Sequence, residues 1–276
     1  MKTLFVTDLD GTLLTREERV SAYSCEKLNR LIDAGMLFTY ATARSARSAE
    51  NAVVGLHIKA PVVLYNGGLI YDYQAGRALS CILFNEEEKW YVLDVLRRFS
   101  IAPFLFAANE GRELLSWIPE RQSVGMARYL VRRANDYRLN PVHSDEALLS
   151  GKVFYFKCIG PREQLEQAWD ILKYDSRFMC IFHQETYQDD FWMEISPRAA
   201  SKANGVAFLR NYLGCDRVVC FGDTSNDSDM FDVCDEKYAV MNADAWLKEK
   251  ATGVIGYCEE DGVAKWLESN SGFGRS

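Results

Sequence analysis

Five short apolar segments constrain the fold of this chain more than any other feature of its sequence. They are residues 4–6, 37–41, 62–65, 218–221 and 238–241, and each ends at a polar or glycine-containing segment. Nearly continuous apolar character, rather than alternation of apolar and polar residues, is typical of strands that are buried on both faces of a parallel sheet. We therefore expect a parallel sheet with these segments as its strands.

Segments with helical periodicity connect these strands near both ends of the chain. Residues 21–34 place apolar side chains at helical spacing and are followed by Gly35. Residues 201–213 have the same pattern, with Ser201 as the expected N-cap and Gly214 after the last turn. These strand–helix–strand units predict an α/β domain that is built from both ends of the chain.

The middle of the chain has a different pattern, which predicts an inserted α+β domain. Neighbouring strands are joined by short turns there, as in antiparallel hairpins. The expected helices are residues 86–99, 122–137 and 162–174, and the expected strands are residues 101–107, 113–118, 152–159, 178–183 and 191–195. We expect one domain from residues 1–80 and 197–276 and a second from residues 81–196.

The overall composition excludes several classes of protein. The chain has 32 Lys and Arg against 39 Asp and Glu, and a net charge of −7 repels polyanions, so we expect no nucleic-acid partner. No signal peptide begins the sequence and no apolar run approaches the ~18 residues of a membrane span, so we expect no membrane partner and a cytoplasmic location. The eight cysteines form no CxxC pair, and the three histidines are not spaced as ligands of one metal.

Two aspartates follow the first expected strand directly, in the sequence Asp8-Leu9-Asp10-Gly11-Thr12. Residues two apart in an extended segment point the same way, so both carboxylates should face one space at the carboxyl end of the strand. Ligands bind at that end in open α/β sheets. Two like charges held this close require a cation or a shared proton.

Polar segments after the second and third strands could reach the same space. Thr42 precedes a helix that is expected to start near Ser45, and a hydroxyl with free backbone N–H groups can bind phosphate there. The same residues could instead be ordinary helix caps. Asn66 and Gly67 belong to an Asn-Gly-Gly segment that forms either a plain turn or a backbone approach to a ligand.

A lysine and two aspartates in the last third of the chain complete the candidate set. Lys202 lies in the first turn of an expected helix, where the helix dipole disfavours a cation, so either an anion lies nearby or the side chain is solvated. Asp223 follows the fourth strand, and Asp227 lies in the turn to the next helix. Oxygen ligands without histidine suit Mg²⁺, although both residues could also be simple helix-start acids.

These segments, in this order, resemble the four motifs of the haloacid dehalogenase superfamily of phosphotransferases: Asp8-x-Asp10-Gly11-Thr12, Thr42, Lys202 and Gly222-Asp223-x-x-Asn226-Asp227. The insertion between the second and third motifs resembles the large α/β cap of the Cof-type subgroup. The resemblance covers nearly the whole chain and implies a Rossmann-like three-layer core with a parallel sheet and an inserted α+β cap domain. Ala43 and Ala203 stand where the superfamily usually has Gly.

The resemblance implies a role for each of these residues. Asp8 would be the nucleophile that forms an aspartyl-phosphate, and Asp10 would protonate the departing alcohol. Thr42 and Lys202 would hold the phosphoryl oxygens. The residues implied for Mg²⁺ are Asp8, Asp10 through its backbone carbonyl, Asp223 and Asp227, and those implied for the substrate are Arg44, Asn66, Gly67 and Asn226.

The function expected from this resemblance is that of a cytoplasmic, Mg²⁺-dependent phosphatase. A large cap favours small phosphorylated metabolites, sugar phosphates above all, because the cap must close over what it admits. A sugar phosphomutase or phosphotransferase on the same scaffold is the first alternative. A non-catalytic protein that binds phosphorylated metabolites is the second, although such a protein would be expected to lack a catalytic carboxylate or Lys202. The sequence predicts no particular oligomeric state.

Overall fold

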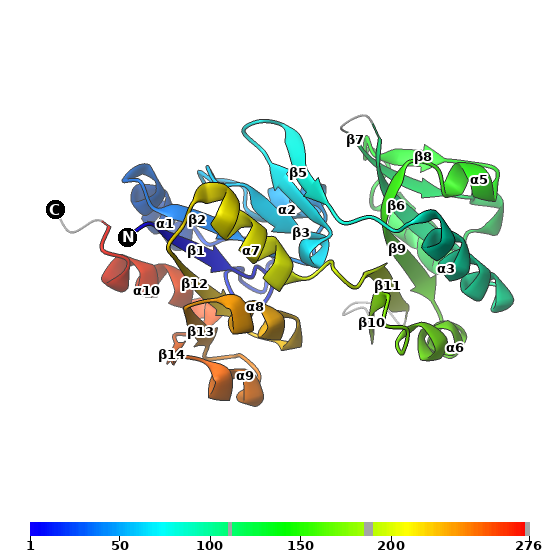
Figure 1. The fold of residues 1–276 in the computed structure, drawn as a ribbon. Helices are drawn as coiled ribbons and strands as arrows, with labels where there is room; N and C mark the ends of the chain where they lie inside the picture. The colour runs from blue at the N-terminus through cyan, green and yellow to red at the C-terminus, as the bar shows by residue number, and fades with distance from the viewer. Residues whose placement is uncertain (110–111, 185–189, 274–276) are drawn as a thin grey trace. The chain divides into compact units, whose positions relative to one another are not determined.

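The chain forms two compact units, which the computed structural model describes for residues 1–109, 112–184 and 190–273. The terminal unit combines Met1–Ser80 with Ala200–Ser276, and the inserted unit comprises Cys81–Ala199. In Figure 1 the terminal unit carries the blue and red ends of the colour range, whereas the inserted unit is the green middle.

A five-stranded parallel sheet forms the centre of the terminal unit, in the order β14-β13-β12-β1-β2. Strand β1 hydrogen-bonds to β2 on one side and to β12 on the other. Residues that follow β1 consequently lie between neighbouring strands at the carboxyl edge of the sheet. The strands are β1 (Thr3–Thr7), β2 (Leu37–Tyr40), β12 (Arg217–Gly222), β13 (Glu236–Val240) and β14 (Gly253–Ile255).

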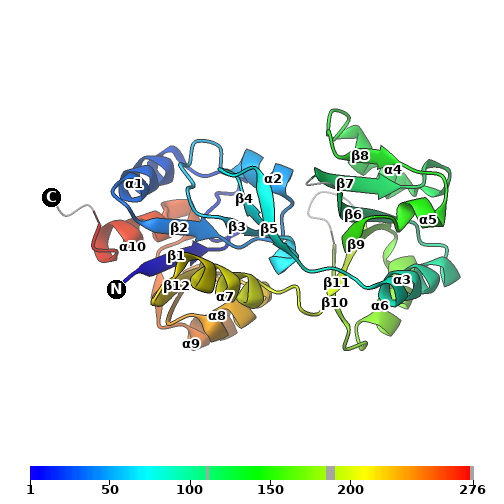
Figure 2. The same cartoon turned by 45° about the horizontal axis from the view of Figure 1, so that its top comes forward.

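Helices cover both faces of this sheet and complete a three-layer α/β fold. Helix α1 (Ala22–Asp33) packs against α10 (Gly262–Asn270), and α7 (Lys202–Leu213) packs against α8 (Ser228–Val233). Figures 1 and 2 show these two pairs on opposite sides of the sheet. The shorter helices are α2 (Ala46–Ala52) and α9 (Ala245–Lys250).

The expected helix ends are confirmed in this unit. The side chain of Ser201 accepts a hydrogen bond from the backbone N–H of Asn204, as an N-cap does, and Gly214 ends α7 in the left-handed conformation. Ser21 caps α1 in the same way through the N–H of Ser24.

The strand expected at residues 62–65 forms at Val62–Leu64, and Tyr65 belongs to the turn that follows it. Strand β3 (Val62–Leu64) meets β2 through one parallel bridge, between Ala41 and Val63, and pairs antiparallel with β4 (Leu69–Asp72). The chain reverses in the short 3₁₀ turn η1 (Tyr65–Gly67), so the next strand must return beside β3. Strand β5 (Arg77–Cys81) completes this small sheet in the order β3-β4-β5.

The inserted unit contains a six-stranded sheet in the order β10-β11-β9-β6-β7-β8. All neighbouring strands are antiparallel except β7 and β8, which are parallel. Helices α3 (Glu86–Arg98) and α6 (Arg162–Leu172) contribute to its hydrophobic core. The strands are β6 (Pro103–Asn109), β7 (Arg112–Trp117), β8 (Leu139–Pro141), β9 (Lys152–Gly160), β10 (Phe178–Gln184) and β11 (Phe191–Pro197).

The expected long helix at residues 122–137 is too long. Helix α4 (Val124–Val131) ends six residues earlier, and β8 and a short helix, α5 (Asp145–Leu148), follow it without having been expected. The buried guanidinium of Arg138 gives the physical reason, because it pairs with Glu113 and, at 2.7 Å, with Asp136. A continued helix would carry Arg138 away from these two carboxylates.

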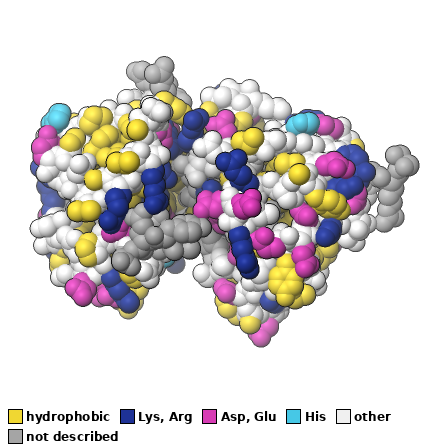
Figure 3. Space-filling model, turned by 180° about the vertical axis from the view of Figure 1, so that it is seen from behind, with side chains coloured by type: hydrophobic (Ala, Val, Ile, Leu, Met, Phe, Trp, Pro, Cys, Tyr) yellow, Lys and Arg dark blue, Asp and Glu magenta, His cyan; other side chains and the backbone are white. Residues whose placement is uncertain are grey.

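The charged side chains of both units are mixed on the face that Figure 3 shows, where Lys and Arg lie among Asp and Glu. Within residues 1–109, 112–184 and 190–273, no helix combines the length and the apolar character that crossing a bilayer requires.

A close backbone contact joins the η1 turn to the start of α7. Gly67 has a φ of +95°, and a Cβ atom on it would lie 2.0 Å from the carbonyl oxygen of Ser201. Only glycine fits this position, because both the conformation and the space exclude a side chain. The turn after β3 is thereby fixed against the N-terminus of the helix that carries Lys202.

We predict that Gly67→Ala destabilises the protein more than Gly76→Ala. Gly76 also has positive φ, at +62°, but a Cβ atom on it would have no other atom within 4 Å. Gly76→Ala should therefore cost only the left-handed strain of about 1–2 kcal/mol, whereas Gly67→Ala should cost about 1–3 kcal/mol more through overpacking. Urea unfolding of both variants measures the difference, and equal losses would contradict the close approach.

Candidate active site

The buried ammonium of Lys202 joins two aspartates that come from distant parts of the sequence. Its Nζ lies 2.7 Å from Oδ1 of Asp8 and 2.7 Å from Oδ1 of Asp227. Asp8 directly follows β1, Asp227 ends the 3₁₀ turn η3 (Ser225–Asp227), and Lys202 is the first residue of α7. The alternative that Lys202 is solvated is therefore wrong, since its side chain is fully buried against two anions.

A third carboxylate, that of Asp223, completes a cluster beside Lys202. Asp8, Asp223 and Asp227 each offer a carboxylate oxygen, and these oxygens lie within 4.8 Å of one another. The hydroxyl of Thr12 donates to Oδ1 of Asp223 at 3.2 Å. Gly11, with a φ of +73°, lets Asp223 approach, because a Cβ on Gly11 would lie 2.2 Å from its Oδ2.

Gly11 and Thr12 therefore help to position the carboxylate of Asp223, and the sequence pattern did not reveal this role. Both residues belong to the motif that starts at Asp8, so their place in that motif was the available signal.

The charges in this cluster are not balanced. Burial raises the pKa of Asp8 well above its ordinary value, and the carboxylates of Asp227 and Asp223 raise it further, against the opposing effect of Lys202. Burial and then Asp227 raise the pKa of Asp223 to about 7. Burial would lower the pKa of Lys202, but Asp227 and Asp8 raise it. Three carboxylates that face one ammonium form an all-oxygen donor set that fits a divalent cation such as Mg²⁺.

Asp227 also shapes the loop that carries Asp223. Its second carboxylate oxygen, Oδ2, accepts the backbone N–H groups of Asp223 at 2.9 Å and of Thr224 at 3.3 Å. The nearby side chain of Asn226 accepts a hydrogen bond from the hydroxyl of Thr224 at 2.7 Å and is not part of the carboxylate cluster. Asp227 thus supports Asp223 through the backbone as well as through its charge.

The carboxylate of Asp10 pairs with Arg44 and not with the cluster. The Nε and Nη2 atoms of Arg44 lie 2.8 and 2.5 Å from the two carboxylate oxygens of Asp10. Strand β1 ends at Thr7, so the alternation that would aim Asp8 and Asp10 into one space does not extend to Asp10. The side chain of Asp10 is 51% exposed, whereas that of Arg44 is 14% exposed.

Glu18 also pairs with Arg44, and no sequence motif pointed to it. Its Oε2 accepts a hydrogen bond from Nη2 of Arg44 at 2.8 Å, and its backbone is left-handed with a φ of 55°. A non-glycine residue in this region is strained and is often found at functional sites. The sequence holds no local signal for this contact, because it depends on the fold of the loop after β1.

Thr42 and Asn66 lie together after β2 and β3. The buried hydroxyl of Thr42 accepts the backbone N–H of Arg44 at 3.1 Å, and its carbonyl accepts the N–H of Asn66 at 2.9 Å. Asn66 has a φ of 51°, and both polar atoms of its buried side chain are without a hydrogen-bond partner among the described residues. A buried amide without partners is unfavourable, so this side chain is suited to contact a ligand.

Asn242 is a further residue of this edge that was not among the expected site residues. Its Nδ2 donates to the carbonyl of Gly11 at 2.7 Å, and its Oδ1 accepts the N–H of Cys258 at 3.0 Å. Two residues on, the N–H of Asp244 donates to the carbonyl of Asp223 at 2.9 Å. A signal was present, since Asn242 closely follows the strand β13, much as Asp8 follows β1.

The fold and this edge of the sheet define a class of protein. A family model described as haloacid dehalogenase-like hydrolase matches residues 5–267, and the chain belongs to that family. The expected fold, with a three-layer core and an inserted α+β unit, is confirmed by its likeness to solved structures that match 98% of this chain.

Among curated relatives, the 5-amino-6-(5-phospho-D-ribitylamino)uracil phosphatase YwtE of Bacillus subtilis is 28% identical over 95% of each chain. The HMP-PP phosphatase of Serratia proteamaculans is 26% identical, over 97% of this chain and 95% of that protein. A haloacid dehalogenase-like hydrolase from Bacteroides thetaiotaomicron superposes with a TM-score of 0.79 at 19% identity, covering 98% of this chain and 99% of its own.

We predict that the metal-free protein loses stability as the pH rises. Asp223 has its pKa raised from 3.8 to about 7, so the folded state binds a proton that the unfolded state has released. Its contribution is full below 3.8 and is lost as the pH passes through about 7. Urea unfolding with a chelator, at several values between about pH 5 and 8, should give a falling free energy of unfolding.

The matched control for this prediction is Asp223→Asn, which keeps the shape of the side chain and removes its titration. This variant should show a smaller fall over the same range. An identical fall in both proteins would mean that Asp223 does not titrate as its surroundings require.

Proposed function

We propose that this haloacid dehalogenase-like hydrolase is a Mg²⁺-dependent phosphatase that hydrolyses small phosphorylated metabolites through an aspartyl-phosphate. The observation that carries the proposal is the cluster of Asp8, Asp223 and Asp227 around the buried ammonium of Lys202 at the carboxyl edge of the parallel sheet. The curated relatives are named phosphatases, which supports a phosphoric monoester as the substrate class.

Asp8 is the nucleophile in this proposal. Lys202 holds Oδ1 of Asp8, so Oδ2 attacks phosphorus. The new bond joins Oδ2 to phosphorus, and the bond from phosphorus to the alcohol oxygen breaks. Asp10 gives its proton to that oxygen and then takes one from the water that hydrolyses the aspartyl-phosphate, which releases phosphate and restores Asp8.

The charged site must accept a phosphate dianion beside three carboxylates. Asp8, Asp223 and Asp227, with the backbone carbonyl of Asp10, would hold a Mg²⁺ ion, which when bound would supply positive charge that offsets this repulsion. Lys202 and the hydroxyl of Thr42 hold phosphoryl oxygens.

The leaving group meets a second set of residues. Arg44 and the unpartnered amide of Asn66 contact its polar groups, beside the backbone at Gly67 and the side chain of Asn226. A polar leaving group of this kind is expected of a sugar phosphate, and one relative is named for a phosphoribityl substrate. Residues 1–80 and 197–276 form the catalytic core in this proposal, and residues 81–196 form its cap.

Replacing the nucleophile gives the most direct test. Asp8→Asn should lower kcat by at least about 1000-fold, because an amide cannot form the acyl-phosphate. Phosphate release from a panel of phosphomonoesters that includes sugar phosphates, measured with and without Mg²⁺, checks the activity and its metal dependence. The control is Asp33→Asn, which changes an exposed aspartate at the end of α1 and should leave activity unchanged.

Two results would contradict the proposal: hydrolysis of no member of the panel by the wild-type protein, or full activity of Asp8→Asn. Transfer of the phosphoryl group to a sugar hydroxyl with little free phosphate would instead identify a phosphotransferase or mutase.

We predict that Arg44→Gln lowers kcat/KM by about 10–100-fold, which corresponds to the loss of charged hydrogen bonds. Arg44 both orients Asp10 and faces the leaving group, so kcat should fall and KM should rise. Arg47→Gln is the matched control, since Arg47 lies in the helix that follows Arg44, α2, and is 47% exposed. Steady-state kinetics of the two variants separate these effects, and equal kinetics would refute the role of Arg44.

A further inference from the structure

The loop between β1 and α1 contains a closed turn whose position in the terminal unit is fixed. The backbone N–H of Thr15 donates to the carbonyl of Arg19 at 3.0 Å, and the N–H of Glu18 donates to the carbonyl of Thr15 at 2.9 Å. The side chain of Glu259 accepts the N–H of Arg16 at 2.7 Å and joins this turn to the 3₁₀ turn η4 (Cys258–Glu260). Glu18 therefore extends from a backbone that is held at several points.

The backbone conformation of Glu18 favours glycine. Its φ is 55°, in the left-handed region, where a residue with a Cβ atom is strained and glycine is not. The conformation of the loop therefore gives no reason for a glutamate at this position. Residues in such conformations cluster at functional sites. The carboxylate of Glu18, which contacts Arg44, is the feature that a glycine would lack.

A single nitrogen atom of Arg44 joins Glu18 to Asp10. Nη2 of Arg44 donates to Oδ1 of Asp10 at 2.5 Å and to Oε2 of Glu18 at 2.8 Å, while Nε donates to the second carboxylate oxygen of Asp10 at 2.8 Å. Nη1 lies 3.4 Å from the hydroxyl oxygen of Ser48 in α2. Both hydrogens of Nη2 thus have an acceptor, and acceptors from three places in the chain set the plane of the guanidinium.

Without Glu18, the pair of Asp10 and Arg44 would be less restrained. The side chain of Asp10 is 51% exposed, and an arginine side chain has many rotamers that an exposed partner does not restrict. Glu18 is 55% exposed, and an ion pair with so exposed a member adds little to the stability of the fold. Its consequence is therefore geometric, because it restricts the guanidinium that orients Asp10.

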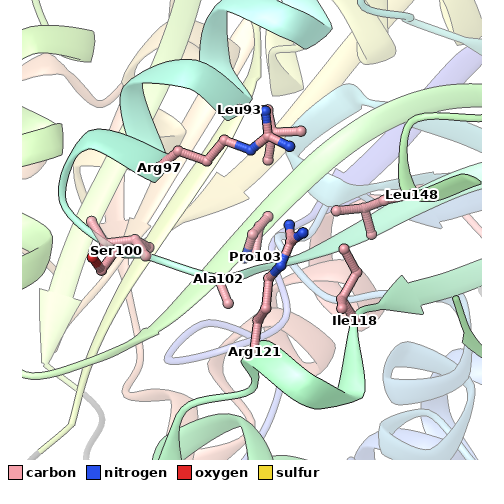
Figure 4. A pocket seen from close by; sticks show the side chains of 9 residues that line it. Leu93, Arg97, Ser100, Ala102, Pro103, Ile118, Arg121 and Leu148 are labelled. Carbon is pink, nitrogen blue, oxygen red and sulfur yellow. The ribbon is translucent and has the colours of Figure 1, made fainter. Parts of the chain in front are cut away.

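A carboxylate shared by two arginines in the inserted unit has no such link to a candidate catalytic group. Arg97 and Arg121 border a pocket (Figure 4), and both pair with Asp145. Glu146 also attracts Arg97, and Glu120 attracts Arg121, so acidic side chains match these cations. This group joins α3, the 3₁₀ turn η2 (Pro119–Arg121) and α5, which is a structural role.

We propose that Glu18 is a positioning residue for Asp10 and acts through Arg44. This inference rests on the proposed function, in which Asp10 is the acid. As the bond between phosphorus and the alcohol oxygen breaks, that oxygen keeps the bonding electron pair and takes the proton of the Asp10 carboxyl group, which leaves Asp10 as a carboxylate. The proton must cross a hydrogen bond, so the orientation of Asp10 affects the rate of this step.

The dependence of the rate on the leaving group tests this role. Nitrophenolate leaves phosphorus without a proton, whereas an alkoxide needs one, so alkyl phosphates depend more on Asp10 as the acid. The parameter to compare is kcat/KM, because it reports the steps up to the aspartyl-phosphate and not its later hydrolysis. Glu18→Gly should lower kcat/KM about tenfold for the best sugar phosphate of the panel, but less than about twofold for p-nitrophenyl phosphate.

Two further variants separate positioning from an effect on the loop. Glu18→Gln keeps an acceptor for Nη2 of Arg44, so its loss on the sugar phosphate should be smaller than that of Glu18→Gly. The matched control is Glu17→Gly, which replaces an exposed glutamate of the same turn and should match the wild type on both substrates. Glu18→Gly itself should unfold at a urea concentration no lower than the wild type, because glycine relieves the left-handed strain.

Wild-type kcat/KM in Glu18→Gly on both substrates, or equal losses on both, would overturn the role of Glu18. The same comparison with Glu18→Gln decides the question if Glu18→Gly does not fold. The wild-type protein separates this failure from that of the proposed function. If the wild type hydrolyses neither substrate, the phosphatase proposal fails and this inference with it, whereas an active wild type and an unchanged variant remove this inference alone.

Discussion

The arrangement of the site depends on the two ion pairs that the buried ammonium of Lys202 forms with Asp8 and Asp227. Lys202 lies at the first position of α7, where the helix dipole disfavours a cation, and it is stable there because Asp8 and Asp227 are both within 2.7 Å. Removing one partner of such a buried pair typically costs about 3–5 kcal/mol. The end of β1, the η3 turn and the start of α7 must therefore meet at one point, and this requirement fixes how the two halves of the terminal unit fit together.

The carboxylate cluster of the terminal unit carries an unequal charge. Three carboxylates share the one ammonium of Lys202 there. The cluster is not neutral by itself, so it favours a ligand of positive charge. A divalent cation fits this surplus of negative charge.

The features that the sequence predicted correctly are those with local causes. Buried strands need continuous apolar residues, and caps such as Ser201 need only their own turn, so most strands and helix ends were found. The residues after strand ends, Asp8 and Asp223, were found for the same reason. Two omissions depend on contacts between residues that are distant in sequence: the helix that ends before Arg138, and the pairing of Glu18 with Arg44. Such contacts leave no mark on the local pattern of residues, because they exist only once the chain has folded.

The position of β1 between β2 and β12 has a consequence for the order in which the protein folds during synthesis. Thr3 pairs with Arg217, and Lys202 follows Asp8 by 194 residues. Most of the chain must therefore be synthesised before β1 can pair with both of its neighbouring strands. Every strand of the six-stranded sheet, in contrast, finds its partners between Pro103 and Pro197. Because domains generally fold as units once their residues have emerged, the middle of the chain can fold first. The carboxylates of the candidate site would then remain solvated and apart until the last strands have been synthesised.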